Sequence, residues 1–406
     1  MLAEIMYRLK RPYHFVKTGL LNGLPGQIKA GFPGRKLKIL AITGTDGKTT
    51  SSTLLYHILK NAGKKVGLIT TVAAYVGDDA LDTGFHVTSP QPADVQKLMK
   101  QMVKDGYEYL ILEVTSHGLY QYRTWGIQPL LAGLTNISNE HLDYHITYEN
   151  YIEAKALLFK KAKVVVLNQD DPSYHRLRKL LRNRQIQVVD YSRSDRLPRR
   201  VQQAVSDRFP EAFNQMNARL IWAVSEVMGV ESGDFADAIA TFPGVVGRMQ
   251  LVKTSKRKTV FIDFAHTPKA LRESLISMRR YMKDNQLSGQ LIAIFGCAGL
   301  RDRSKRPEMA RIAVELADIV ILTAEDPRTE DVWSIIREMK DGLSSGHDKI
   351  MTIVDRSQAI TMALTIATSK DVVGVMGKGH EKSMCYGKIE YPWSDEAAVH
   401  ESLSRL

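Results

Sequence analysis

Short apolar runs alternate with segments of helical spacing along the first half of the chain, a pattern typical of a parallel sheet covered by helices. The apolar runs predict buried strands at 38–42, 65–71, 109–114, 130–135 and 163–167. The intervening segments predict helices at 50–61, 92–104 and 148–160. Ligands of such sheets bind beyond the carboxyl ends of the strands, so the polar residues that follow these runs are expected to share one crevice.

A second alternation of the same kind begins at Arg248. Strands are predicted at 260–264, 291–295, 319–323 and 372–376, and helices at 267–282, 305–316 and 331–343. The stretch at 190–213, between the two alternations, is polar and rich in arginine. We therefore expect an α/β fold with a central domain at 36–243 and a smaller, Rossmann-like C-terminal domain at 244–406.

Residues 1–35 are interrupted by glycine or proline at six positions from Gly23 to Gly34, which predicts a short N-terminal helix and a linker. The chain has 406 residues, 44% of them apolar, and no apolar run long enough to span a bilayer. Its start lacks the apolar core of a signal peptide, and Cys297 and Cys385 make no metal-site spacing. We expect a cytoplasmic protein without stable membrane insertion.

The net charge of +12 suits polyanionic ligands such as ATP and nucleotide sugars. It would also suit nucleic acid, but the basic residues are scattered and no recognised nucleic-acid motif occurs. Small molecules are therefore the expected partners, and nucleic acid is not.

The residues between the first predicted strand and the first predicted helix indicate a phosphate-binding loop. A glycine-rich turn there presents backbone N–H groups and a helix N-terminus to an anion. Lys48 is expected to reach the outer phosphates, and the Thr49 hydroxyl to bind Mg²⁺. The central domain is thus predicted to be of the phosphate-loop ATPase type, and the alternative is a turn that needs glycine and binds nothing. The expected nucleotide contacts are Gly44, Thr45, Asp46, Gly47, Lys48, Thr49 and Thr50.

The compact form of this loop, T-G-T-x-G-K-T, resembles that of the Mur ligases and folylpolyglutamate synthetases, which use ATP to join an amino acid to a carboxylate. Most Mur ligases have Asn where this chain has Asp46. The order and spacing of further similar segments extend the resemblance over nearly the whole chain, with the tripeptide synthetases of peptidoglycan precursor synthesis as the nearest branch. These segments are 113–118, 136–145, 153–159, 213–218, 244–249, 263–268, 296–307 and 377–381.

The resemblance implies a site for ATP and two Mg²⁺ ions. Glu113 would bind one Mg²⁺ together with Thr49, and His141 would be the imidazole ligand of the second. Lys155 would be carbamylated by CO₂, and burial would favour this because only a deprotonated amine reacts. Without the resemblance, Lys155 reads as an exposed helix lysine. The implied catalytic residues are Lys48, Lys155, His141 and Glu113, and the further nucleotide contacts are Asn217, Arg248, Asp263 and His266.

The reaction that the resemblance implies adds a diamino acid to UDP-MurNAc-L-Ala-D-Glu through an acyl phosphate. Diaminopimelate-adding relatives carry D-N-P-R, and Arg328 stands at the position of that Arg, whereas Asp326 replaces the Asn. We therefore expect meso-diaminopimelate, with Arg328 on its distal carboxylate and Glu381 on its distal ammonium. Contacts to the acceptor are expected at Thr88, Ser89, Thr115, Gln121 and Arg123. Contacts to the amino acid are expected at Arg301, Glu325, Asp326, Arg328, Gly377 and Glu381.

Residues 1–35 leave no room for the uridine-nucleotide-binding domain, of about a hundred residues, that full-length Mur ligases place there. We expect weak affinity for the uridine end, or a partner protein that supplies this contact. Two alternatives stay open. One is a related ligase that acts on another carboxylate acceptor, and the other is a non-catalytic nucleotide-binding subunit.

Overall fold

The computed structural model describes residues 2–70, 74–75, 80–81, 91–138, 140–182, 184–252, 254 and 258–406. The chain divides into two compact units, Met1–Pro243 and Gly244–Leu406. Each unit is built on its own sheet, and each is described by itself below. Among the described residues, no helix is both long and apolar enough to cross a membrane.

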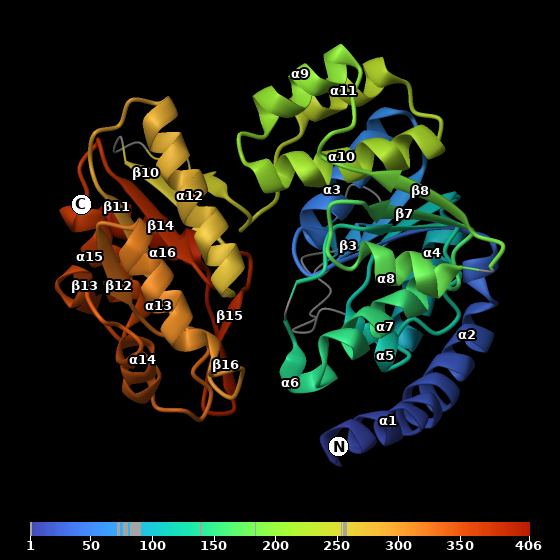
Figure 1. Cartoon of the computed structure of the whole chain (residues 1–406), viewed down its shortest axis with the longest axis horizontal. Helices are drawn as coiled ribbons and strands as arrows, with labels where there is room; N and C mark the ends of the chain where they lie inside the picture. Colours follow the sequence, from blue (N-terminus) through green and yellow to red (C-terminus); the bar gives the residue numbers. More distant parts are fainter. Residues whose placement is uncertain are drawn as a thin grey trace. The chain divides into compact units, whose positions relative to one another are not determined.

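The first unit contains a sheet whose central strands are parallel and nearly all buried (Figure 1). Apolar, β-branched strands with helices between them bury both faces, as parallel sheets require. The short strands β3 and β4 add antiparallel pairs at one edge. The spatial order is β4 (Ala80–Leu81), β3 (Ala74–Tyr75), β2 (Val66–Ile69), β5 (Tyr109–Glu113), β1 (Lys38–Thr43), β6 (Leu131–Leu134), β7 (Val164–Asn168) and β8 (Gln187–Tyr191).

Two sets of helices cover this sheet. On one face α3 and α10 pack against the strands, and α9 and α11 pack together beyond them. On the other face α4, α7 and α8 share an apolar core with the strands. The bounds are α3 (Lys48–Asn61), α4 (Pro92–Lys104), α5 (Ser116–Tyr120), α6 (Leu142–His145), α7 (Tyr148–Phe159), α8 (Tyr174–Leu181), α9 (Arg199–Arg208), α10 (Ala212–Val227) and α11 (Ser232–Thr241).

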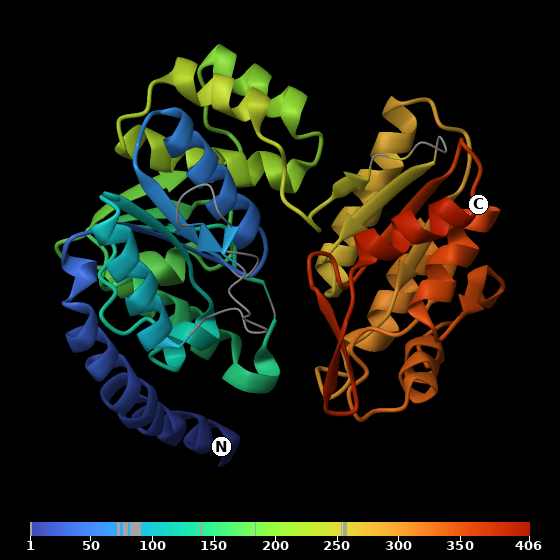
Figure 2. The same ribbon diagram turned by 180° about the vertical axis from the view of Figure 1, so that it is seen from behind.

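The N-terminal segment differs from the expected short helix and linker. It is helical almost throughout, as α1 (Leu2–His14), a π-helix (Phe15–Gly23) and α2 (Leu24–Ala30), and a 3₁₀ turn at Pro33–Arg35 follows. Figures 1 and 2 both show it along the outside of the first unit. Gly23, one of the glycines that suggested a linker, serves packing instead, because a Cβ there, as on Gly19, would lie 2.6 Å from the Trp125 side chain.

The second unit has a mixed sheet in which only the edge strand β9 is antiparallel. Helices α12, α13 and α14 share a core with one face, and α15 and α16 share a core with the other. The strands are β13 (Ile350–Thr352), β12 (Ile319–Leu322), β11 (Leu291–Phe295), β14 (Val372–Met376), β10 (Thr259–Asp263) and β9 (Gln250–Val252) in spatial order, with β15 (Ser383–Tyr386) and β16 (Ile389–Pro392) as a separate hairpin. The helices are α12 (Pro268–Asp284), α13 (Lys305–Leu316), α14 (Val332–Asp341), α15 (Arg356–Ile366), α16 (Asp395–Arg405) and a 3₁₀ turn at His347–Lys349. The predicted α/β fold class is confirmed.

Candidate active site

A tight loop connects β1 to α3 at the carboxyl edge of the first sheet. Gly47 caps α3 in the left-handed conformation, with φ of 78°, and a Cβ there would overlap the Asn217 amide. The loop is held by Asn136, whose carbonyl accepts from the Thr45 N–H at 2.8 Å and whose side chain accepts from the Asp46 N–H at 3.1 Å. The first-turn N–H groups of α3 therefore point out of a fixed loop, as an anion site requires.

Two buried side chains whose oxygen atoms could bind a metal ion lie next to the loop. Thr49, in the first turn of α3, donates its hydroxyl to the Glu113 carboxylate at 3.0 Å. Glu113 comes to this place because β5 pairs with β1 in parallel and places it beside Ile42. A carboxylate and a hydroxyl beside a phosphate loop fit Mg²⁺, which prefers oxygen ligands and retains several waters. Among the described residues, no group of three His, Cys, Asp or Glu side chains is placed to hold a metal by itself.

Lys155, on α7, contacts the loop. Its side chain is only 1% exposed, and its ammonium donates to the Gly44 carbonyl at 2.6 Å. Burial, together with the nearby charge of Lys48, holds the pKa of Lys155 well below its usual range. The interpretation as an exposed helix lysine is therefore wrong, and burial favours the neutral amine at this point.

Tyr151 is a site residue that the sequence did not reveal. Its hydroxyl lies 3.1 Å from the Thr45 hydroxyl of the loop, and its ring contacts both candidates for the second metal site. The Lys155 nitrogen is 4.6 Å from the ring centroid, and the His141 ring is 6.1 Å away, edge-on. His141 has a left-handed backbone, with φ of 57°, and lies 3.9 Å from the Glu140 carboxylate. The structure thus gathers His141 and Lys155 around one aromatic ring.

The predicted acceptor contacts lie on and after α5. The Thr115 side chain accepts from the Gly118 N–H and caps α5. Gln121 donates to the Tyr144 hydroxyl at 2.9 Å and accepts from Arg123 Nε at 2.9 Å, so these three side chains form one polar row. Thr88 and Ser89 lie outside the described residues.

Beneath this row lies a buried hydrogen-bonded chain from α1 to α5. The Tyr7 hydroxyl is 2.9 Å from His145 Nδ1, and His145 Nε2 is 3.0 Å from the Ser116 hydroxyl. Burial, with the charges of His117 and Lys155, lowers the pKa of His145 to about 3, so this imidazole is neutral. Short-range patterns gave no signal for it because Tyr7 and His145 are far apart in the sequence.

The second unit holds the other expected nucleotide contacts. The Arg248 guanidinium lies 4.4 Å from the centroid of the Phe264 ring. Asp263 accepts from the Met249 N–H, the Ala265 N–H and the Ser274 hydroxyl at 2.7 to 2.9 Å, so its carboxylate braces the segment that carries Arg248. His266 Nδ1 lies 2.9 Å from the Phe264 carbonyl.

A second polar cluster forms where β12 and β14 end. Asp326 and Arg328 both have left-handed backbones, with φ of 43° and 53°, a strained conformation often found at functional sites. Lys378 bridges Asp326 at 2.8 Å and Glu381 at 2.5 Å. The Glu381 carboxylate, expected to bind the distal ammonium of the amino acid, is paired with Lys378 in this structure.

The same cluster leaves two groups with unused hydrogen-bonding capacity. Among the described residues, the buried Nε of Arg328 and the buried Oε2 of Glu325 have no hydrogen-bond partner. Burial raises the pKa of Glu325 to about 7. A Cβ on Gly377 would overlap the Glu325 carboxylate, which explains glycine there. Arg301, also expected at this site, is exposed.

Both units match domains of a known protein family. Residues 42–227 match the Mur ligase middle domain, and residues 247–379 match the Mur ligase, glutamate ligase domain. The chain belongs to the Mur ligase family. The predicted family is thereby confirmed.

Similar proteins include two curated relatives named UDP-N-acetylmuramoyl-L-alanyl-D-glutamate--2,6-diaminopimelate ligase. That of Clostridium botulinum is 36% identical over 86% of this chain and 74% of its own length, and that of Clostridium tetani is 37% identical over 93% and 79%. A solved structure of a ligase with this name is 29% identical, covers 94% of this chain and 82% of that chain, and has a TM-score of 0.60. The folylpolyglutamate synthase of Mycobacterium tuberculosis shares the fold, with a TM-score of 0.70 at 17% identity over 92% of this chain and 96% of that chain.

Proposed function

We propose that this protein is an ATP-dependent ligase that adds meso-diaminopimelate to UDP-MurNAc-L-Ala-D-Glu. The observation that supports this proposal most is made at the phosphate loop. The Thr49–Glu113 pair and the buried Lys155 amine both lie there. The names of the relatives supply the substrates, and the site supplies the chemistry that their joining requires.

The first step joins two anions. A carboxylate oxygen attacks the γ-phosphorus of ATP, the bond to the β,γ-bridging oxygen breaks, and ADP leaves from an acyl phosphate. Bound Mg²⁺ supplies positive charge that offsets the repulsion between the two anions. Lys48, whose ammonium lies over the loop at 2.5 Å from the Thr45 carbonyl, adds a further positive charge there, and the N-terminus of α3 binds the phosphates.

The second step forms the amide. The amine nitrogen attacks the acyl carbon, the bond between that carbon and the phosphate oxygen breaks, and the nitrogen loses a proton. We propose that Lys155 is carbamylated: its neutral amine attacks CO₂ and loses a proton, which leaves an anionic carbamate. The carbamate and His141 would hold a second Mg²⁺, apart from the ion that Thr49 and Glu113 would hold.

The choice of diaminopimelate rests on Arg328. Its Nε is buried and has no hydrogen-bond partner in the described part of the chain, and Asp326 is occupied by Lys378. A carboxylate on the distal carbon would give this guanidinium two parallel hydrogen bonds, whereas lysine would bring an ammonium to a cation. Hydrogen bonds to charged groups contribute about 1.5–3 kcal/mol each, so losing one corresponds to about 10- to 150-fold in kcat/KM.

The test is ADP release with ATP, Mg²⁺, UDP-MurNAc-L-Ala-D-Glu and either amino acid. We expect turnover only with all components, preference for diaminopimelate, and loss of that preference in Arg328→Ala but not in Arg337→Ala, an exposed arginine of α14. Turnover with another carboxylate acceptor but not with UDP-MurNAc-L-Ala-D-Glu would contradict the proposed substrate. Nucleotide binding without turnover under any of these conditions would contradict the enzyme.

A further inference from the structure

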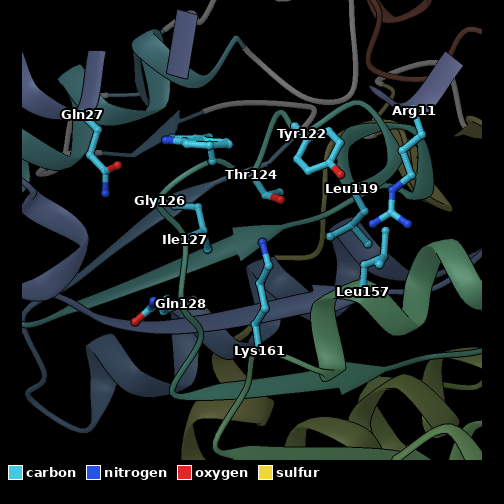
Figure 3. Close-up of a pocket in the computed structure, with 11 residues that line it drawn as sticks. Arg11, Gln27, Leu119, Tyr122, Thr124, Gly126, Ile127, Gln128, Leu157 and Lys161 are labelled. Carbon is cyan, nitrogen blue, oxygen red and sulfur yellow. The ribbon is translucent and has the colours of Figure 1, made fainter. Parts of the chain in front are cut away.

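A cavity of about 450 Å³ lies between the N-terminal helices and the body of the first unit. Its walls come from α1, α2, the loop between α5 and β6, and the end of α7 (Figure 3). The volume falls in the range of small-molecule sites. The proposed ligase chemistry uses none of the residues that line it.

Two cations point into this cavity. Figure 3 shows Lys161 rising from the end of α7 towards Thr124, and Arg11 reaching in from α1 beside Leu119 and Leu157. No carboxylate is among the described residues that line the cavity, and neither cation takes part in a described ion pair. The Nε of Arg11 is buried without a hydrogen-bond partner in the described part of the chain. Burial, and then the charge of Arg11, lowers the pKa of Lys161.

Aromatic side chains form another part of the wall. Tyr122 lies under the Arg11 guanidinium at 5.6 Å, and its backbone is left-handed, with φ of 58°. Such a backbone is costly for a tyrosine and persists where surrounding structure fixes it. Trp125 is fixed by Gly19 and Gly23 of the π-helix, which leave no room for any larger residue. Flat apolar surface beside two cations suits a ligand with a planar ring and an anionic group.

Adjacent side chains connect this cavity to the candidate active site. Tyr122 follows Gln121, which donates to the Tyr144 hydroxyl at 2.9 Å. The Tyr144 ring lies 4.2 Å from that of His117, and the His117 ring lies 4.8 Å from that of His141. An extended ligand bound in the cavity would therefore reach the acceptor contacts along one continuous row.

We propose that this cavity binds the uridine diphosphate end of the nucleotide-sugar substrate. The phosphates would pair with Arg11 and Lys161, and the uracil would lie against the Tyr122 and Trp125 walls, with Gln27 and Gln128 as amide partners for its edge. This assignment rests on the proposed function for the identity of the nucleotide, and on the cavity alone for the chemistry of the ligand.

The test is calorimetric titration of the full chain with UDP, uridine, pyrophosphate and ADP, without the other substrates. We expect UDP to bind more tightly than uridine or pyrophosphate, because it alone uses both halves of the cavity. Lys161→Ala and Arg11→Gln should each weaken UDP binding about tenfold or more. Lys160→Ala, the neighbouring lysine outside the cavity, should leave it unchanged.

A separate ADP titration of Lys161→Ala distinguishes the two sites, since ADP binding at the phosphate loop should be retained. Equal UDP affinity in wild type, Lys161→Ala and Arg11→Gln would overturn the assignment, as would a KM for the nucleotide sugar that these variants leave unchanged. UDP binding that depends on both cations in a protein without ligase turnover would support the cavity and contradict the proposed function, so the two failures are distinguishable. Circular dichroism of each variant excludes loss of folding as the cause.

Discussion

Replacing Lys155 with methionine should make the protein more stable and its stability less dependent on pH. The folded chain holds this amine in a 1% exposed position where burial lowers its pKa, whereas the unfolded chain restores a pKa near 10.5. Between the two values the unfolded state binds a proton that the folded state lacks. Stability of the wild type therefore rises with pH in that window, by up to about 1.4 kcal/mol per pH unit at 25 °C.

Lys155→Met has no such titration, so the free energy of unfolding of the wild type should rise relative to that of Lys155→Met as the pH increases towards 10.5, by up to about 1.4 kcal/mol per pH unit. The assay is the opening free energy of peptides from β1 and α7, measured by hydrogen exchange in metal-free, CO₂-depleted buffer, because a two-unit chain need not unfold in one step. Lys160→Met is the matched control, since it removes a lysine of the same region that is not fully buried. Parallel pH dependences of wild type and Lys155→Met would refute the reasoning and show a charged lysine in the fold.

Three further perturbations test other parts of the structure. Gly47→Ala should raise the Kd for ATP at least tenfold, because a left-handed backbone costs a residue other than glycine about 1–2 kcal/mol and the added Cβ would overlap the Asn217 amide. Gly63 has a similar φ but open space around it, so Gly63→Ala should leave ATP binding unchanged. Glu113→Gln should raise the Mg²⁺ concentration for half-maximal turnover about tenfold or more without changing the KM for the nucleotide sugar, and an unchanged Mg²⁺ dependence would remove it from the metal site. Asp395→Asn should lower the stability of the second unit by about 3–5 kcal/mol, because it leaves the fully buried Arg356 without its ion-pair partner. Hydrogen exchange measures this change, and Glu401→Gln, at an exposed position, should leave the stability unchanged.

The strands expected from the sequence were predictable because each is a short, continuous apolar run. The strands at Leu291–Phe295 and Val372–Met376 have the predicted bounds, and most others differ by a residue or two at their ends. The edge strands β9 and β13 were missed because three residues carry too little pattern. The polar 190–213 stretch contains the helix α9, whose apolar positions Val201 and Val205 are too few to signal it.

The N-terminal segment shows where local patterns mislead. Gly19 and Gly23 have low helix propensity, yet they lie in a helical segment because their missing side chains admit Trp125. Propensity is a weak prior that tertiary packing overrides, and the contact that overrides it joins residues about a hundred positions apart.

The candidate active site was likewise predictable from the sequence only in part. The phosphate loop is contiguous, so the sequence displays it whole. Tyr151, which lies beside the loop, Lys155 and His141, becomes visible only when α7 packs against the loop. The pairing of Lys378 with Asp326 likewise depends on the approach of two strand ends.

The burial of Lys155 links loop geometry to acid–base state. A protonated lysine at this depth would be costly, and its neutral form still donates one hydrogen bond to the Gly44 carbonyl. The burial that brings the amine to the start of the loop is therefore also what lowers its pKa and favours the neutral form that reacts with CO₂. Lys48, which lowers the pKa of Lys155 further, is the residue expected to be neutralised by phosphate. Nucleotide binding should then raise the pKa of Lys155 again, so that a carbamate formed before ATP arrives is favoured over one formed after.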